Sequence, residues 1–334
     1  MKQSNTKILD LITRYKLLCI MLFIIILMLF LAPSFFNPTN LINIVANVSI
    51  NGIAAVGMTL LMISRSFDIS IGSMMVLTGA IAIITVNRFD NPALAIIIGT
   101  LAGVLTGLLN GTLVAKLKIN SFIATLGTFV IYHGMTFSLT NMRPVATPNV
   151  TFQKFATAEI FKIPLVVFYF FAATMIIWFI SRFTQLGKNA YAIGGNSEAC
   201  RRVGIKVDLY TMIFFVISGV FTAFAGVLLS CKIQAASAIF GENVALVVIA
   251  GIVLGGVHLE GGVGSVLGVV QGMIVIALID NITIFLGLIG YYQMFFRSLV
   301  LLGVLIFDVQ SVKQARKRLE KFEMSMLKRE AGAR

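Results

Sequence analysis

The composition of this 334-residue chain excludes a soluble globular protein. Hydrophobic residues make up 58% of it, charged residues only 12%, and the mean hydropathy is +0.98, which is more apolar than the surface of a water-soluble protein tolerates. We therefore expect an integral membrane protein. The net charge of +13 does not require nucleic acid as a partner, because basic segments beside a membrane are attracted to anionic lipid headgroups.

Several kinds of chemistry are also unexpected. The three cysteines, Cys19, Cys200 and Cys231, are too widely spaced for a disulfide framework, and two histidines are too few for a metal site. The phosphate-binding pattern G-x-x-x-x-G-K-[ST] is absent from the sequence. We therefore expect that this chain is not an enzyme and binds neither a metal nor a cofactor, so that any ATP is hydrolysed by another subunit.

The apolar stretches predict an all-α, polytopic fold. A helix that spans a bilayer needs about 20 mostly apolar residues, and the pattern predicts about ten spans, of which the eighth is too short to cross alone. The predicted spans are 17–33, 43–63, 71–86, 93–115, 122–140, 163–181, 210–231, 244–257, 263–285 and 289–307.

The distribution of basic residues predicts the orientation. With these spans, 20 Lys and Arg residues fall on one side and 5 on the other, and the richer side is expected to be cytoplasmic. Both termini are then cytoplasmic. The predicted organisation is an N-terminal segment 1–16, one transmembrane domain 17–307 with a periplasmic loop 141–162 and a cytoplasmic loop 182–209, and a basic cytoplasmic tail 308–334.

Two short segments containing glycine and an acid interrupt the apolar pattern, near 64–73 and near 255–265. Flexible or charged backbone at membrane depth is costly unless it lines a cavity or packs inside protein. Two interpretations are open: the breaks expose carbonyls and helix ends to a wet cavity, or their small residues allow close helix packing. The glycines concerned are Gly72, Gly255, Gly256, Gly261, Gly262 and Gly264.

The cytoplasmic loop contains a short helix with a signal at each end. In the run 194–205, Asn196 or Ser197 can cap a two-turn helix and Gly204 can end it. This helix is either a docking element for a cytoplasmic protein or an interfacial helix that holds Arg201 and Arg202 at the lipid headgroups.

Four parts of the chain carry a recognisable pattern: Phe67–Ser73, Ser121–Gly127, Gly195–Arg201, and Val253–Gly256 followed by Gly261–Ser265. They resemble the permeases of bacterial ABC sugar importers, in the ribose, arabinose, xylose and autoinducer-2 branch. The resemblance implies a multi-pass protein of the bacterial inner membrane that pairs with a second permease chain, identical or different. It also implies a periplasmic sugar-binding protein as a partner, and a cytoplasmic ATPase that binds the ATP and Mg.

The resemblance places the ATPase contact on the short cytoplasmic helix. Glu198, Arg201 and Arg202 would supply charge complementarity, with Ala199 and Val203 packed beneath them. The expected coupling residues are Asn196, Glu198, Ala199, Arg201, Arg202, Val203 and Gly204.

Polar residues in or beside the apolar spans mark the expected substrate pathway. Amides and carboxylates of this kind can hold a neutral polyol. Asp68 is costly so close to apolar spans unless it is paired or hydrated, and both an ion pair with Arg65 and a sugar contact are open. The expected pathway residues are Asn47, Asn51, Asp68, Ser70, Ser73, Thr125, Gln234, Asp280 and Asn281.

Three other functions are considered. A branched-chain amino acid ABC permease is the nearest, since it is similar in fold. An ion-coupled secondary transporter would use buried acids, for which Asp68, Glu260 and Asp280 are candidates. A structural or assembly protein would explain the helices and leave the interrupted segments unexplained.

Overall fold

The computed structural model describes residues 33–287 continuously, together with residues 22, 25, 26, 28–30, 290, 292, 295, 298, 299, 302 and 303. This part of the chain contains seven helices that are long and apolar enough to cross a membrane. They are α3 (Pro38–Ile63), α4 (Ile71–Phe89), α5 (Pro92–Gly111, continued by the π-helical turn η2, Thr112–Lys116), α6 (Ser121–Thr140), α8 (Leu165–Phe183), α10 (Val207–Ile233) and α12 (Val266–Phe285).

These helices coincide with seven of the predicted spans. The eighth, α11 (Val244–Leu254), has 11 residues and is too short to span, as predicted. Both predicted breaks are present, but the first covers only residues 64–70, because α4 already begins at Ile71. The predicted spans 17–33 and 289–307 lie largely outside the described residues, so the total of about ten spans and the sides of the termini stay predictions.

The all-α prediction is correct apart from two very small sheets. β1 (Val145–Ala146) pairs antiparallel with β4 (Ala235–Ala236), and β2 (Glu159–Ile160) pairs antiparallel with β3 (Ile163–Pro164). The predicted loop 141–162 also contains the short helix α7 (Val150–Thr157). The 3-10 turns η1 (Pro33–Phe36) and η3 (Ala238–Gly241) precede α3 and α11.

Asparagine side chains begin several of these helices. The Oδ1 atom of Asn37 accepts a hydrogen bond from the backbone N–H of Thr39 at 3.0 Å, and Asn91 does the same for Leu94 at 3.1 Å. Each of these asparagines is followed by proline, whose fixed φ suits the first helical turn. The Asn-Pro pairs at 37–38 and 91–92 therefore define where α3 and α5 start.

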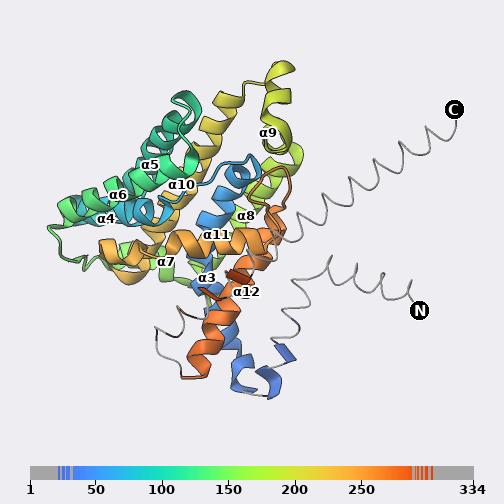
Figure 1. Ribbon diagram of the computed structural model, residues 1–334. Helices are drawn as coiled ribbons and strands as arrows, with labels where there is room; N and C mark the ends of the chain where they lie inside the picture. Colours follow the sequence, from blue (N-terminus) through green and yellow to red (C-terminus); the bar gives the residue numbers. More distant parts are fainter. Residues whose placement is uncertain are drawn as a thin grey trace, which may run out of the picture.

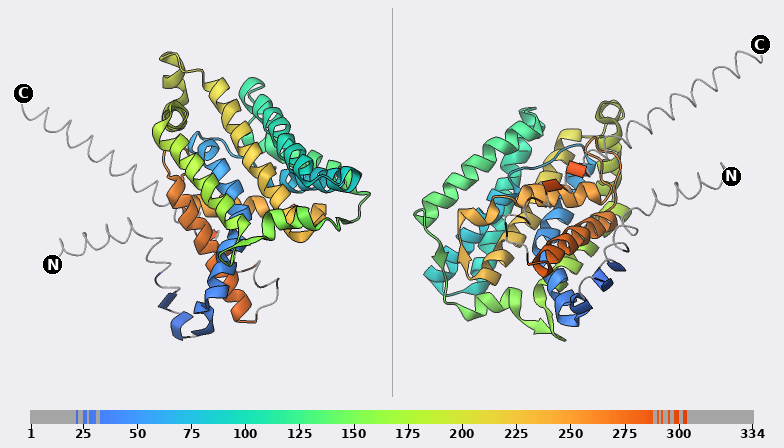
Figure 2. Two further views of the ribbon diagram at one scale, coloured as in Figure 1. Left: turned by 180° about the vertical axis from the view of Figure 1, so that it is seen from behind. Right: turned by 60° about the horizontal axis from the view of Figure 1, so that its bottom comes forward.

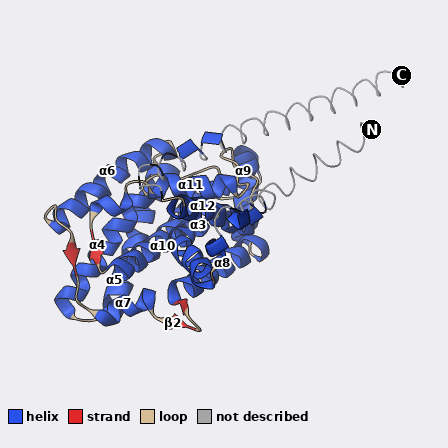
Figure 3. Ribbon diagram, turned by 90° about the horizontal axis from the view of Figure 1, so that it is seen from below, coloured by secondary structure: helices blue, strands red, loops and turns tan. Residues whose placement is uncertain are grey.

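The α3 helix is the centre of the bundle. It packs against α8, α10, α11 and α12, and α9 (Gln185–Arg202) covers its C-terminal end. Figure 1 shows α9 at the top and the N-terminal end of α3 at the bottom, and Figure 3 shows α4, α5 and α6 gathered to one side of α3. From behind, α8 and α10 lie alongside α3 (Figure 2).

The most extensive packing between two helices is that of α5 with α10, and glycine makes it possible. Gly99, Gly103, Gly107 and Gly111 recur every four residues along α5 and face α10. A Cβ atom at Gly107 would lie 2.6 Å from the carbonyl oxygen of Phe215, so no larger residue fits without moving the backbone. Small residues at this spacing let two membrane helices approach closely. This row of glycines was not used in the sequence-based predictions.

Candidate functional site

The helix α9 is two helices joined at Asn196, whose φ of −157° and ψ of 97° are extended. The Oδ1 atom of Asn196 accepts a hydrogen bond from the N–H of Ala199 at 2.9 Å and so caps the second helix. That helix ends in a Schellman motif: the N–H of Gly204 (φ 85°) donates to the carbonyl of Arg201, and that of Ile205 donates to Cys200. The predicted cap and end of this helix are therefore confirmed. We call residues 197–203 the docking helix, after the first of the two roles considered for it above.

The side of the docking helix that faces inward was predicted incorrectly. Ala199 and Val203, expected to pack beneath the charged residues, are exposed, and Val203 is 76% exposed. Cys200 is the buried residue instead, with 6% exposure. Ala199 and Val203 are four residues apart and so share one face of the helix, and that face is exposed while Cys200 is buried. The docking helix thus presents apolar as well as charged surface to solvent.

The two arginines of the docking helix have different partners. The Arg202 guanidinium pairs with Glu198 at 2.8 Å, and both side chains are about three-quarters exposed. Arg201 instead pairs with Asp208 at 2.5 Å, and the same carboxylate oxygen accepts from Lys118 at 2.5 Å. Asp208 lies in the first turn of α10, where the helix dipole favours an acid. The Arg201 side chain therefore has an ion-pair partner in this chain, Asp208, which the sequence-based prediction missed.

Both helix breaks meet the N-terminal half of α9. The N–H of Gly262 donates to the carbonyl of Ile63 at 2.8 Å, and the Tyr191 hydroxyl donates to the carbonyl of Gly264 at 2.9 Å. Gly194 packs directly on the first of these bonds, since an added Cβ would overlap both the Ile63 oxygen and the Gly262 nitrogen. We call these five residues the α9 junction.

The six glycines that were predicted to lie in the breaks have two roles, neither of which requires a wet cavity. Gly72 packs on the backbone of Gly241, and Gly255 packs on the backbone of Gly268, where larger residues would not fit. The other four glycines have positive φ angles, a conformation that other residues rarely adopt. They are Gly256 (87°), Gly261 (77°), Gly262 (77°) and Gly264 (152°).

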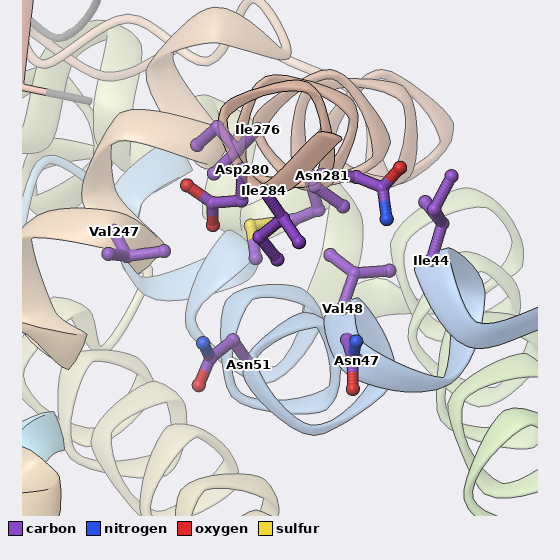
Figure 4. A pocket seen from close by; sticks show the side chains of 11 residues that line it. Ile44, Asn47, Val48, Asn51, Val247, Ile276, Asp280, Asn281 and Ile284 are labelled. Atoms are coloured by element: carbon purple, nitrogen blue, oxygen red, sulfur yellow. The ribbon is translucent and has the colours of Figure 1, made fainter. Parts of the chain in front are cut away.

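Four of the nine expected pathway residues surround one cavity between α3, α11 and α12. These are Asn47 and Asn51 on α3 and Asp280 and Asn281 on α12, and the cavity has a volume of about 70 Å³. Figure 4 shows Asn47 and Asn51 carried by α3, opposite Asp280 on α12. The rest of the lining is apolar: Ile44, Val48, Val247, Met273, Ile276, Ala277 and Ile284.

Amide hydrogen bonds join the walls of this cavity. Asn40 and Asn281 each donate to the other's Oδ1, at 3.1 and 3.0 Å, which connects α3 to α12. Asn47 accepts a hydrogen bond from Lys232 of α10 at 2.8 Å. The sequence analysis did not identify Asn40 or Lys232, although the spacing of Asn40, Asn47 and Asn51 places all three near one face of a helix.

Three further expected pathway residues lie elsewhere, in a fully buried cluster around Asp68. One oxygen of Asp68 accepts from the N–H and hydroxyl of Ser70, at 2.8 and 2.5 Å, and the other accepts from the Asn110 amide at 3.0 Å. Asn110 in turn accepts from the Tyr132 hydroxyl at 3.3 Å, and Thr125 accepts from the N–H of Ile69 at 3.1 Å. We call this set the Asp68 cluster.

The Asp68 cluster contains no positive charge. Arg65 is exposed, and within the part of the chain that the structure describes Asp68 has no ion pair, so the pairing with Arg65 considered above is not observed. Burial raises the pKa of the Asp68 carboxyl, while the hydrogen bonds from Ser70 and Asn110 act in the opposite direction. The carboxyl is stabilised by neutral donors alone.

The last two expected pathway residues belong to neither group. Ser73 donates its hydroxyl to the carbonyl of Ser70 within α4 at 2.9 Å. Gln234 caps the C-terminus of α10, and its carbonyl accepts from the N–H of Thr147 in the loop after α6.

A bundle of long apolar helices with a projecting, capped helix and a polar-lined cavity defines a multi-pass membrane permease. The chain belongs to the family described as branched-chain amino acid transport system / permease component, which matches residues 40–305. This membership confirms the permease assignment made from the sequence motifs.

The curated proteins to which the chain is similar include sugar permeases. It is 33% identical to the ribose import permease protein RbsC of Bacillus subtilis over 287 residues, covering 85% of this chain and 89% of the relative. It is 32% identical to the galactose/methyl galactoside import permease protein MglC of Escherichia coli K12, over a match that covers 91% of this chain and 95% of the relative. It is also 32% identical to the L-arabinose transport system permease protein AraH of the same strain, over a match that covers 91% of this chain and 92% of the relative. No solved structure matches the chain significantly.

Proposed function

We propose that this chain is the transmembrane permease of an ATP-driven importer in the bacterial inner membrane, and that it passes a sugar from a periplasmic binding protein into the cytoplasm. The relatives named for ribose, galactose and arabinose support a pentose or hexose as the substrate. The chain itself binds no cofactor in this proposal. ATP and Mg are bound by a separate ATPase subunit, and a second permease chain, identical or different, completes the membrane channel.

The exposed docking helix is the observation that carries this proposal. A two-turn helix capped by Asn196 and ended by Gly204 keeps its shape without a partner, and it leaves Ala199 and Val203 uncovered. A lipid-facing interfacial helix would explain the apolar residues equally well. The Glu198–Arg202 pair, however, lies beside Val203 and is about three-quarters exposed, which fits the polar rim of a protein interface.

Reversing the charge of the docking helix tests the ATPase contact. We expect Arg202→Glu to lower the amount of ATPase that co-purifies by about tenfold, equivalent to roughly 1.4 kcal/mol of binding free energy, with membrane insertion unchanged. Arg201→Glu combined with Arg202→Glu should reduce it further, because Arg201 also orients the helix through Asp208.

The control is Lys188→Glu, which makes the same charge change at an exposed position on the other half of α9. It should leave co-purification unchanged. Normal co-purification of the Arg202→Glu variant would assign the helix to the membrane interface instead.

The cavity between α3, α11 and α12 is the proposed sugar contact. Asn47, Asn51 and Asp280 combine amide donors, amide acceptors and a carboxylate with an apolar lining, which matches the hydroxyls and the C–H faces of a sugar. Its volume of about 70 Å³ lies below the range of small-molecule sites, so in this proposal the cavity widens to admit a sugar. Asp68 and its cluster belong to the structural framework in this proposal.

An uptake assay distinguishes the proposed function from its alternatives. Vesicles holding the chain with its ATPase and binding protein should accumulate radiolabelled ribose, galactose or arabinose only while ATP is hydrolysed. Competition by leucine in place of the sugars would indicate a branched-chain amino acid permease. Uptake that persists without ATP hydrolysis and stops when the ion gradient is dissipated would indicate a secondary transporter.

A further inference from the structure

The two halves of α9 are placed very differently. The docking helix projects into solvent, whereas residues 185–195 are built into the bundle, where Ala190 and Ile193 are 0% and 2% exposed. We propose that Tyr191 and Gly194 are positioning residues that pass movement of the docking helix to α3 and α12, the helices that wall the cavity. The proposal rests on the proposed function, in which the ATPase supplies that movement.

The α9 junction is where such movement would reach both walls. The Gly262–Ile63 hydrogen bond joins the C-terminal end of α3 to the loop before α12, and Gly194 packs on both of its atoms. Tyr191 holds the carbonyl of Gly264, two residues before α12 begins at Val266. A displacement of α9 therefore acts on the ends of α3 and α12 at once.

The opposite ends of the same two helices are held by a second contact. Asn40 and Asn281 exchange two amide hydrogen bonds at 3.1 and 3.0 Å. This amide pair lies at the cavity, which Asn281 also lines, whereas Asn51 and Met273 line it on the side toward the α9 junction. Along α3, Ile63 is 12 residues from Asn51, which is about 18 Å at the helical rise of 1.5 Å per residue.

This arrangement makes the spacing of α3 and α12 adjustable at one end only. A helix moves as a stiff element, so a change at the Ile63–Gly262 bond shifts α3 against α12 while the Asn40–Asn281 pair stays closed. The width of the cavity then follows the position of α9. The extended residue Asn196 separates the docking helix from this contact, so docking residues and positioning residues can be changed independently.

Two substitutions remove this contact, and a neighbouring glycine supplies the control. Gly194→Ala forces the backbones of α9, α3 and the α11–α12 loop apart, and Tyr191→Phe deletes one hydrogen bond without changing the shape of the ring. Gly195→Ala is the matched control, because no atom lies within 4 Å of its added Cβ.

The readout is the chemical accessibility of the cavity wall. Val48 lines the cavity and is 5% exposed. In a protein whose Cys19, Cys200 and Cys231 are replaced by Ala, the cysteine introduced by Val48→Cys therefore reacts faster when the cavity opens. The full complex with ATPase and binding protein is reconstituted, and the rate of alkylation by a water-soluble maleimide is measured without nucleotide and with trapped ATP.

We expect the rate in the parent and in the Gly195→Ala variant to differ by about fivefold or more between the two states. The Gly194→Ala and Tyr191→Phe variants should lose this response while the ATPase still co-purifies. A full response in the Tyr191→Phe and Gly194→Ala variants would overturn the inference. If Gly194→Ala does not fold, Tyr191→Phe alone decides. Failure of the ATPase to co-purify with the parent would overturn the proposed function instead.

Discussion

The Asp68 cluster and the cavity between α3, α11 and α12 are built from similar polar residues, but those of the cluster are fully buried and those of the cavity border open space. In the Asp68 cluster, Asp68, Ser70 and Asn110 are 0% exposed and bonded to one another. In the cavity, Asn47, Asn51 and Asp280 border open space. An acid within an apolar chain is therefore a poor indicator of a transport site unless a cavity adjoins it.

The largest effect is expected from removing the Asp68 carboxyl. Asp68→Ala leaves the N–H and hydroxyl of Ser70 and one N–H of the Asn110 amide buried without their acceptor, although that amide keeps its bond to the Ser70 hydroxyl oxygen at 2.9 Å. Each buried donor that loses its acceptor costs about 1–3 kcal/mol. We expect a loss of about 3 kcal/mol or more in the free energy of unfolding, measured by thermal unfolding of the purified protein in detergent.

Asp68→Asn removes the carboxylate but keeps the size of the side chain, so it shows how much of the Asp68→Ala effect comes from the loss of side-chain atoms. The asparagine keeps an oxygen for Ser70 but places an N–H group against the N–H group of Asn110, so this hydrogen bond is lost and buried donors face each other, at a cost of about 1–3 kcal/mol. Because burial already disfavours the charged carboxyl, we expect no further penalty. An Asp68→Ala protein as stable as the parent would show that the cluster does not hold the fold together.

The contact at the edge of the cavity should have an intermediate effect. Asn281→Ala removes two hydrogen bonds between α3 and α12 and should cost about 1–2 kcal/mol of stability. Asn40→Ala also removes the bond from Asn40 to the Phe35 carbonyl at 2.8 Å and should cost somewhat more. The double variant should cost little more than Asn40→Ala alone, since that variant already removes the shared interaction. Additive losses would mean that Asn281 is stabilised by other partners.

The cavity itself should be nearly neutral for stability and sensitive in transport. Asn51→Ala is expected to change the free energy of unfolding by less than about 0.5 kcal/mol and to lower sugar uptake several-fold at limiting substrate. Asn43→Ala is the control, because Asn43 is exposed on the same helix and is not among the residues that line the cavity. Equal uptake by the two variants would remove Asn51 from the pathway.

Sequence periodicity and end signals were enough to predict most of the fold. Long apolar runs defined the seven spanning helices, and the Asn196 and Gly204 signals correctly bounded the docking helix. These features are local, since they depend on residues within one or two turns of each other. The glycine row of α5 could also have been found from its spacing of four.

The candidate site was only partly predictable, because its assembly depends on long-range contacts. Nothing near Asp68 in the sequence shows that Asn110, 42 positions away, is its partner, and the nearby Arg65 was a misleading candidate. Likewise, the inward turn of Cys200 depends on how α9 packs against the bundle. Local patterns identified polar residues but could not sort the buried cluster from the cavity.

The glycine row of α5 has a consequence for how this protein tolerates changes in length. Each residue of a helix turns the chain by about 100°, so inserting or deleting one residue between Gly99 and Gly111 would rotate the remaining glycines away from α10 and bring larger side chains against its backbone. Natural variants that differ in length should therefore avoid this stretch. They should instead place their insertions in the loop between α6 and α7.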